Sequence, residues 1–256
     1  MRGLLRALSF LTRGPFPAED LRPKELARVI LWFPVAGITI GGLVAAVYWV
    51  AAQGLPPFVA ATLALLAGIA VTGGLHEDGL GDTFDALGGR STPEEMLMIM
   101  KDSRQGTFGV LAIVGSVMLR VAALAALPAA VGAWTLVVAH CVSRSAVVGV
   151  MATSKPVSSR GLGAAYAKEL HHISALLTAA LGSLLAVVVW GVDGFLIVGV
   201  VVVVLAVFMA WVYRNLGGYT GDVLGAVEQF AQAGVLVAAA WMFGRGWEIA
   251  PWLPWG

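Results

Sequence analysis

Long stretches with almost no charged residues dominate this chain, and they decide what it can fold into. Each is close to the ~20 residues that an α-helix needs to cross the hydrocarbon core of a bilayer. The stretches lie at about residues 29–52, 57–75, 107–128, 130–152, 173–191, 194–213 and 223–243. They predict an all-α polytopic membrane protein with about seven transmembrane helices and short interfacial helices between them.

The composition excludes several other classes of protein. Apolar residues make up 59% of the chain and charged residues 12%, against roughly 45–50% and about 25% in a soluble domain. The 16 Lys and Arg nearly balance the 15 Asp and Glu, so the chain lacks the basic field that a nucleic-acid partner requires. Cys141 is the single cysteine, which excludes an internal disulfide. No linker or repeat divides residues 1–256, so we expect one integral-membrane domain.

Lys and Arg alternate along the chain in a way that predicts its orientation. They precede the first stretch and recur in the segments 76–106, 153–172 and 214–222, whereas the connections near residues 54–56, 127–128 and 190–194 contain none. Basic residues favour the cytoplasmic side of a membrane. We therefore expect a protein of the inner (cytoplasmic) membrane with a cytoplasmic N-terminus and an external C-terminus.

The first 14 residues carry an amphipathic pattern. At 100° per residue, Arg2, Arg6, Ser9 and Arg13 fall in one stripe, and leucines face away from it. This pattern is typical of a helix that lies on the membrane surface. The alternative is a plain orientation signal with no other role.

An acidic segment follows the second apolar stretch. If it is helical, Asp78, Asp82 and Asp85 stand at about 0°, 40° and 340° and share one face. Their mutual repulsion destabilises a helix, and Gly79 and Gly81 each cost about 1 kcal/mol more. A bound cation would offset both penalties, and oxygen ligands favour Mg²⁺ or Mn²⁺ over zinc. The alternative is a solvated loop whose acids balance nearby cations.

A basic segment comes next on the predicted cytoplasmic side. Thr92 and Glu95 have the spacing of a capping box and predict a short interfacial helix, so residues 76–106 read as an acidic and basic catalytic loop plus this helix. After it, Lys101, Ser103 and Arg104 precede the start of an apolar helix, where unpaired N–H groups can hold an anion. These residues predict a phosphate-binding site, the alternative being a basic stop-transfer boundary.

Some charged residues fall inside the apolar stretches or at their ends. Ionisable residues in membrane helices usually face an internal cavity at a functional site, which we expect for Arg144 and Glu228. Arg120 lies nearer the outer half of its stretch, where it could snorkel to the surface, so we interpret it as structural. Thr220 and Asp222 begin the last stretch on the cytoplasmic side. We interpret three glycines of the first stretch as positions where helices pack closely, namely Gly37, Gly41 and Gly42.

The acids and cations thus converge on one membrane side. Carboxylates for a metal and cations for phosphate oxygens make a phosphoryl-transfer site. His76 is a base, a support for the ligands or an interfacial residue, and its position alone does not decide which.

Five segments carry a resemblance to a known family. Together they run over nearly the whole chain, and they resemble the cobalamin synthase family of adenosylcobinamide-GDP ribazoletransferases. The segments are Leu8–Arg13, Gly73–Asp85, Met100–Gly109, Val142–Arg144 and Gly217–Ala226.

The resemblance implies the last joining step of vitamin B12 assembly. In that reaction α-ribazole or its 5′-phosphate displaces GMP from adenosylcobinamide-GDP in the presence of Mg²⁺. It implies that Mg²⁺ is held by three carboxylates, that phosphate oxygens bind cations and hydroxyls, and that His76, Asp102 or Asp222 accepts the proton. The implied metal ligands are Asp78, Asp82 and Asp85, and the phosphate-binding residues are Lys101, Ser103, Arg104, Arg144 and Thr220.

The partners expected on this basis are the two substrates and the lipid bilayer, together with a second copy of the chain in a homo-oligomer or other cobalamin-assembly enzymes. Two alternatives remain open at this point. A phospholipid synthase similar to the CDP-alcohol phosphotransferases would release CMP, and a membrane transporter would need essential charges on both faces of the membrane.

Overall fold

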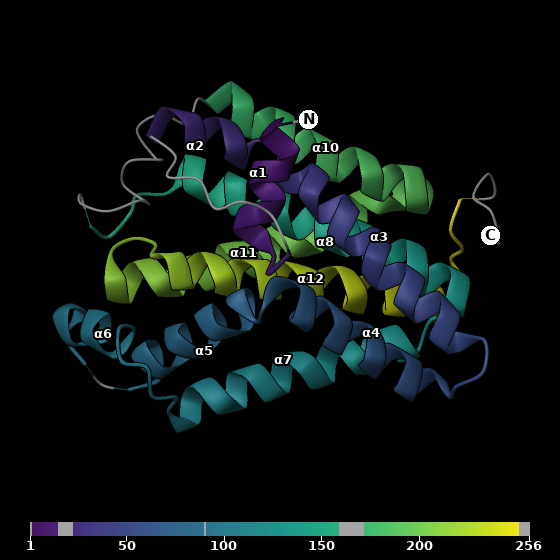
Figure 1. The fold of residues 1–256 in the computed structure, drawn as a ribbon, viewed down its shortest axis with the longest axis horizontal. Coiled ribbons are helices and arrows are strands. Elements are labelled where there is room, and N and C mark those ends of the chain that lie inside the picture. The colour runs from purple at the N-terminus through teal and green to yellow at the C-terminus, as the bar shows by residue number, and fades with distance from the viewer. Residues whose placement is uncertain (1, 15–22, 90, 159–171, 251–256) are drawn as a thin grey trace.

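The described part of the chain is helical. The structure is a computed structural model that describes residues 2–14, 23–89, 91–158 and 172–250. Most of its helices run along the long axis of the molecule, while α1 crosses them (Figure 1). The elements are α1 (Arg2–Leu11), α2 (Pro23–Ile30), α3 (Phe33–Ala52), α4 (Pro57–Thr72), α5 (Leu75–Gly88), α6 (Pro93–Ile99), α7 (Thr107–Ala125), α8 (Ala129–Thr153), α10 (His172–Trp190), η1 (Gly191–Asp193), α11 (Gly194–Leu216) and α12 (Gly221–Phe243).

The apolar helices confirm an all-α membrane fold. Among the described residues five segments are long and apolar enough to cross a membrane, namely α3, α7, α8, Ala175–Leu216 and α12. The fourth of these has 42 residues and is divided by η1 into α10 and α11. Helix α4 passes the same test only together with α5. Every predicted stretch therefore coincides with a helix, while the number of crossings and the orientation stay predictions.

A two-glycine break separates α4 from α5. Gly73 and Gly74 have φ values of 67° and 72°, which glycine adopts without strain, and the two helix axes differ by 90°. The acidic segment therefore forms the helix α5, which the spacing of its aspartates requires, rather than the alternative loop, because the break restarts the helix at Leu75. Arg13 N donates to Val71 O at 2.8 Å, which ties the chain after α1 to this break.

Close helix packing fixes α3 against α8. A Cβ on Gly37 or Gly41 would collide with the backbone or Cβ of His140, whereas one on Gly42 would meet no atom of the described residues within 4 Å. The packing role predicted for these glycines is thus confirmed for two positions and wrong for Gly42, which points away from α8. Helices α8 and α12 are largely buried, whereas α7 and α11 expose large side chains such as Leu111 and Phe195.

The short helices also follow their sequence patterns. Helix α1 buries Ala7, Leu8 and Leu11 and ends before Arg13, so it is shorter than the predicted 1–14. At the start of α6, Glu95 N donates to Thr92 Oγ1 at 3.3 Å and Thr92 N donates to Glu95 Oε2 at 2.8 Å. The predicted capping box is confirmed.

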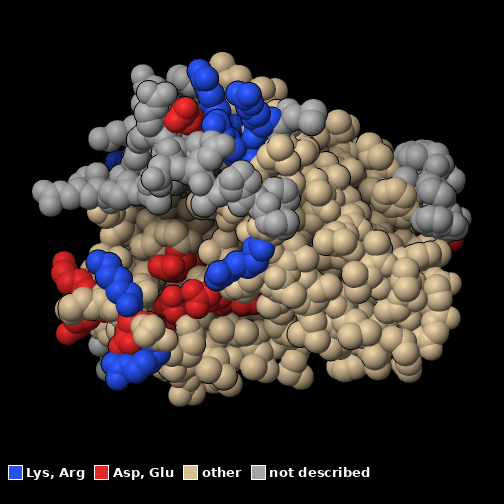
Figure 2. All heavy atoms as spheres, viewed as in Figure 1, with Lys and Arg blue, Asp and Glu red and all other residues tan. Residues whose placement is uncertain are grey.

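Charged side chains gather at one end of the molecule. Figure 2 shows a patch of acidic residues near the end where α5, α6 and α11 lie, with cations around it, a further group of cations near α1 and α2, and a largely uncharged surface toward the other end of that face. Exposed acids and cations therefore gather at one end of the molecule, while the side of the membrane that this end faces stays a prediction.

Candidate active site

A cavity of about 450 Å³ opens beside the acidic patch. One of its walls is polar and comes from α5, the start of α12 and the segment before α12. An apolar part of the lining comes from α1, α2, α3 and α8, and we call it the apolar wall. The polar wall contains His76, Asp78, Thr220 and Asp222, and the apolar wall includes Phe10, Ile30, Phe33, Val147 and Met151.

Two glycines allow α5 to approach the start of α12. A Cβ on Gly79 would lie 2.8 Å from the carbonyl oxygen of Asp222, and a Cβ on Gly225 would lie 3.2 Å from Gly79 Cα. Only glycine, which has no Cβ, allows the two backbones to approach this closely. The contact places Asp78 and Asp222 together on the wall of the cavity, although 144 positions separate them (222 − 78).

Thr220 organises the start of α12. Its Oγ1 accepts a hydrogen bond from Val223 N at 3.2 Å, which caps the helix, and its hydroxyl lies 3.4 Å from Asp222 Oδ2 and 3.7 Å from Met100 Sδ. The predicted phosphate-binding hydroxyl is thus a helix cap that also lines the cavity. Its contact with Met100 brings the chain after α6 next to the cavity.

Asp82 lies on α5 near the other acids of the site and contacts the segment that precedes α7. Gln105 Nε2 donates to Asp82 Oδ1 at 2.9 Å. A Cβ on Gly81 would come within 2.5 Å of Gln105 Oε1, so Gly81 leaves room for the glutamine. Asp82 also experiences the negative charges of Asp78, Asp222 and Asp85. A group of like charges of this kind favours a bound cation.

Asp85 is engaged at the start of α7. Its Oδ2 accepts a hydrogen bond from Gly106 N at 2.6 Å, and its Oδ1 accepts one from Gly109 N at 2.8 Å. A Cβ on either glycine would collide with this carboxylate. The unpaired N–H groups predicted to hold a phosphate therefore hold a carboxylate of the same chain, because Asp85 satisfies them from the facing helix.

The described residues contain no three His, Cys, Asp or Glu side chains placed together as ligands of one metal ion. Asp78, Asp82 and Asp85 share a face of α5 as predicted, but Asp82 is bonded to Gln105 and Asp85 to the start of α7. Mg²⁺ commonly takes only one or two carboxylates plus substrate phosphates. Asp78 and Asp82 are oxygen donors of that kind, and they fit such a site.

The basic segment after α6 is exposed. Lys101, Ser103 and Arg104 are all exposed. The Arg104 guanidinium is occupied by Asp102, to which its Nη2 donates at 2.6 Å. These hydrogen bonds lower the pKa of Asp102 to about 2. Asp102 is therefore a weak base that does not line the cavity, which argues against its predicted catalytic role.

Arg144 does not lie on the cavity. It is 1% exposed and forms an ion pair with Glu228, which is 0% exposed. Its guanidinium also bonds to Ser143 and His140. The predicted phosphate-binding role is not supported by this position, because the cation is neutralised inside the bundle. The expectation that Arg144 and Glu228 face the interior is confirmed.

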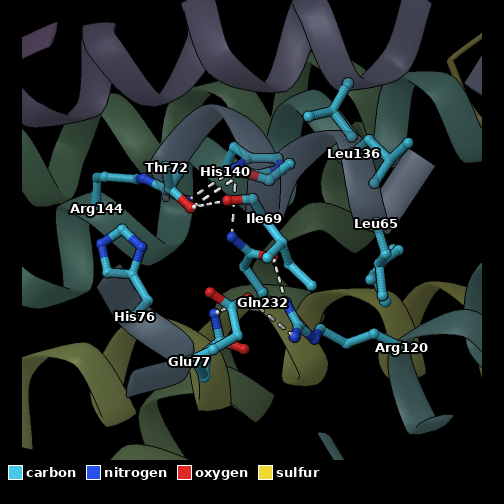
Figure 3. A pocket seen from close by; sticks show the side chains of 14 residues that line it. Leu65, Ile69, Thr72, His76, Glu77, Arg120, Leu136, His140, Arg144 and Gln232 are labelled. Atoms are coloured by element: carbon cyan, nitrogen blue, oxygen red, sulfur yellow. Dashed lines mark hydrogen bonds and ion pairs between the residues drawn. The ribbon is translucent and has the colours of Figure 1, made fainter. Parts of the chain in front are cut away.

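Arg120 belongs to the same interior. It is 3% exposed, and it donates to Glu77 Oε1 at 3.4 Å and to Gln232 Oε1 at 3.3 Å. Snorkelling to the surface was the wrong expectation, because acceptors from α5 and α12 reach the guanidinium within the bundle. Figure 3 shows these side chains around a second cavity of about 20 Å³.

His76 connects the two regions. It lines both the large cavity and the small interior one, and its Nδ1 lies 3.8 Å from Glu228 Oε2. It is therefore placed to contact a ligand in the large cavity while its other side faces the buried charges.

The sequence interpretation missed several members of this interior network. Gln229 Nε2 donates to Glu77 Oε1 and to Glu228 Oε2, both at 3.0 Å, and His140 lies beside Arg144 and Gln232. Their spacing could have indicated that they belong to this network, since His140 precedes Arg144 by four residues and Gln232 follows Glu228 by four. Residues four apart share a helix face.

Comparison with known proteins gives a consistent result. A sequence model of the family described as cobalamin-5-phosphate synthase matches residues 3–240. A protein of Bradyrhizobium diazoefficiens named adenosylcobinamide-GDP ribazoletransferase is 40% identical over 251 residues, which cover 93% of this chain and 94% of the relative. Proteins of the same name from Leptothrix cholodnii and Shewanella baltica are 36% and 34% identical, covering 96% and 89% of this chain and 94% and 89% of their own. No solved structure matches the chain.

These matches favour the reaction implied by the five segments over a phospholipid synthase or a transporter. The family match extends over nearly the whole chain and includes all the residues that line the polar wall of the cavity. The protein therefore belongs to the cobalamin-5-phosphate synthase family, and it is an enzyme.

Proposed function

We propose that the protein transfers the phosphocobinamide moiety of adenosylcobinamide-GDP to α-ribazole or its 5′-phosphate and releases GMP, in the last assembly step of cobalamin biosynthesis. The observation that carries this proposal is the cavity in which Asp78, Asp222 and Thr220 face an apolar wall. The names of the relatives supply the substrates.

The reaction forms one P–O bond and breaks another. A ribose hydroxyl attacks the phosphorus next to the aminopropanol arm of the corrinoid, and the bond between that phosphorus and the bridging oxygen of GMP breaks. The hydroxyl proton passes to a base. Of the three candidates, His76 and Asp222 line the cavity, whereas Asp102 is paired with Arg104. We assign the proton to Asp222, because its carboxylate lies at the cavity beside the Thr220 hydroxyl.

Mg²⁺, when bound, neutralises negative charge on the diphosphate and on the departing GMP. Asp78 and Asp82 would hold it, since they are neighbouring carboxylates on the face of α5. Asp85 is an unsuitable third ligand while it accepts two backbone hydrogen bonds at the start of α7.

Lys101 would bind phosphate oxygens. It follows Met100, whose sulfur lies 3.7 Å from the Thr220 hydroxyl at the cavity, and its side chain is exposed. Its ammonium group would attract the diphosphate and help to fix its position. Ser103 and Arg104 lie on the same segment, where Arg104 would reach a phosphate after releasing Asp102.

The site would lie on the cytoplasmic side of the inner membrane. The support is the presence of Lys and Arg in the segments 76–106, 153–172 and 214–222 and their absence from the connections at residues 54–56, 127–128 and 190–194. In this orientation a water-soluble nucleotide substrate enters and leaves without crossing the bilayer.

The test is GMP release by purified, folded protein. Wild-type protein given adenosylcobinamide-GDP and α-ribazole should release GMP with Mg²⁺ and stop when a chelator is added. Asp82→Asn should abolish this activity. Asp193→Asn, which changes an acid in η1 far along the chain from the site, is the matched control and should keep it.

Two results would contradict the proposal. One is wild-type turnover by Asp82→Asn in protein that is shown to be folded. The other is GMP release that continues unchanged after the divalent ions have been removed.

A further inference from the structure

We infer that the apolar wall of the large cavity, with Phe10 at its edge, binds the aromatic base of the ribazole substrate. The inference rests on the proposed function and deepens it, because it assigns a place to one part of one substrate. It also assigns a role to α1, whose predicted position on the membrane surface does not explain why it reaches the site.

Phe10 and Phe33 form an aromatic surface at the cavity. Their ring centroids are 5.7 Å apart, with an angle of 23° between the ring planes, and both side chains line the cavity. Phe33 is buried, whereas Phe10 is 49% exposed. A partly exposed aromatic ring that is held against a buried one offers a face on which a planar base can stack.

The polar wall of the same cavity sets the direction of the ligand. Asp78, Thr220 and Asp222 line the same cavity as Phe10. A nucleoside has an apolar, planar end and a polar sugar end. With its base on the aromatic surface, its ribose hydroxyls point toward the carboxylates, where the proposed reaction needs them.

The size of the cavity favours the nucleoside over the corrinoid. Pockets that enclose a drug-sized molecule measure about 300–1,000 Å³, and this one measures about 450 Å³. A benzimidazole nucleoside is of that size, whereas the corrin ring with its amide side chains is several times larger. The larger substrate would therefore meet the site from outside, through its diphosphate.

Packing holds α1 in place to present Phe10. A Cβ on Gly3 would collide with the Trp32 indole ring, and Ala7, Leu8 and Leu11 are buried. The side of α1 that carries these residues is thus fixed, and Phe10 is left at the cavity. Substituting Phe10 should change ligand binding more than it changes folding.

The test measures binding of α-ribazole and of adenosylcobinamide-GDP separately, by titration calorimetry on the full chain in lipid nanodiscs. Phe10→Ala should raise the Kd for α-ribazole about tenfold, which lies within the range of base–aromatic stacking. It should leave the Kd for adenosylcobinamide-GDP unchanged. Phe10→Tyr keeps the ring and should restore the wild-type Kd to within about twofold.

Phe195→Ala is the matched control, since Phe195 is 64% exposed on α11 and does not line the cavity. It should bind both ligands as the wild type does. An unchanged Kd for α-ribazole in Phe10→Ala would overturn the inference, as would an equal loss of affinity for the corrinoid substrate. Failure of the wild type to release GMP would instead reject the proposed function, so the two failures are distinguishable.

Discussion

The buried ion pair between Arg144 and Glu228 leads to the strongest prediction about stability. Glu228 is 0% exposed and accepts hydrogen bonds from Arg144, Gln232 and Ser143. In Glu228→Gln the charge disappears, while Arg144 stays 1% exposed. Its Nε and Nη2 already have no hydrogen-bond acceptor among the described residues, and Ser143 and His140, which contact its Nη1, carry no carboxylate to replace Glu228. Breaking a buried ion pair from one side costs about 3–5 kcal/mol.

The assay is reversible unfolding in mixed detergent micelles, with the free energy of unfolding extrapolated to native conditions. Glu228→Gln should lower it by about 3–5 kcal/mol. The double variant Glu228→Gln with Arg144→Gln should recover most of that loss, because neither group is then charged. Glu94→Gln changes an exposed acid in α6 and should stay within about 0.5 kcal/mol of the wild type.

Two results would refute this reasoning. A loss below about 1 kcal/mol in the single variant would mean that Arg144 does not depend on Glu228. A double variant no more stable than the single one would mean that the loss has another origin than the unpaired cation.

Three further predictions concern the neighbourhood of the site. Asp85→Ala removes both hydrogen bonds to the start of α7 and should cost about 1–3 kcal/mol; hydrogen exchange should become faster at those amides, and unchanged exchange would argue against the cap. Gly79→Ala should cost about 1–3 kcal/mol, because its Cβ would lie 2.8 Å from the Asp222 carbonyl oxygen; Gly115→Ala, whose Cβ would have no atom of the described part of the chain within 4 Å, should not lower the unfolding temperature. The pKa of Asp102 is lowered to about 2, so its ion pair contributes stability above its ordinary pKa of 3.8 and loses that contribution as pH falls toward 2; Asp102→Asn should therefore leave the pH profile of GMP release unchanged in the neutral range, and a shifted profile would restore Asp102 as a base.

The helices could be predicted from the sequence because membrane spans depend on local properties. An apolar stretch of ~20 residues must satisfy its own backbone hydrogen bonds, so it forms a helix wherever it lies. The predicted stretches at 107–128 and 130–152 became α7 (107–125) and α8 (129–153). The Thr92 capping box was equally local, since both of its hydrogen bonds join residues three apart.

The polar residues of the site could be found from the sequence, but their partners could not. Asp85 and Gly109 are 24 positions apart, and Arg120 and Glu77 are 43. The spacing of residues along one helix predicts which face of that helix a side chain occupies. It does not predict which other helix packs against that face. For this reason Asp85 was predicted as a metal ligand and Arg120 as a surface residue, although each lies against a partner from another helix.

The ion pair in the bundle also bears on how the protein enters its membrane. Arg144 lies in α8, and Glu228 follows 84 residues later in α12. During synthesis α8 must therefore insert before the acid that neutralises its arginine has been made, and a lone arginine at the centre of a helix disfavours insertion by about 2.5–3.5 kcal/mol. The apolar residues of α8 must outweigh this insertion cost of Arg144. The charge of Arg144 is neutralised by Glu228 only when α12 packs against α8.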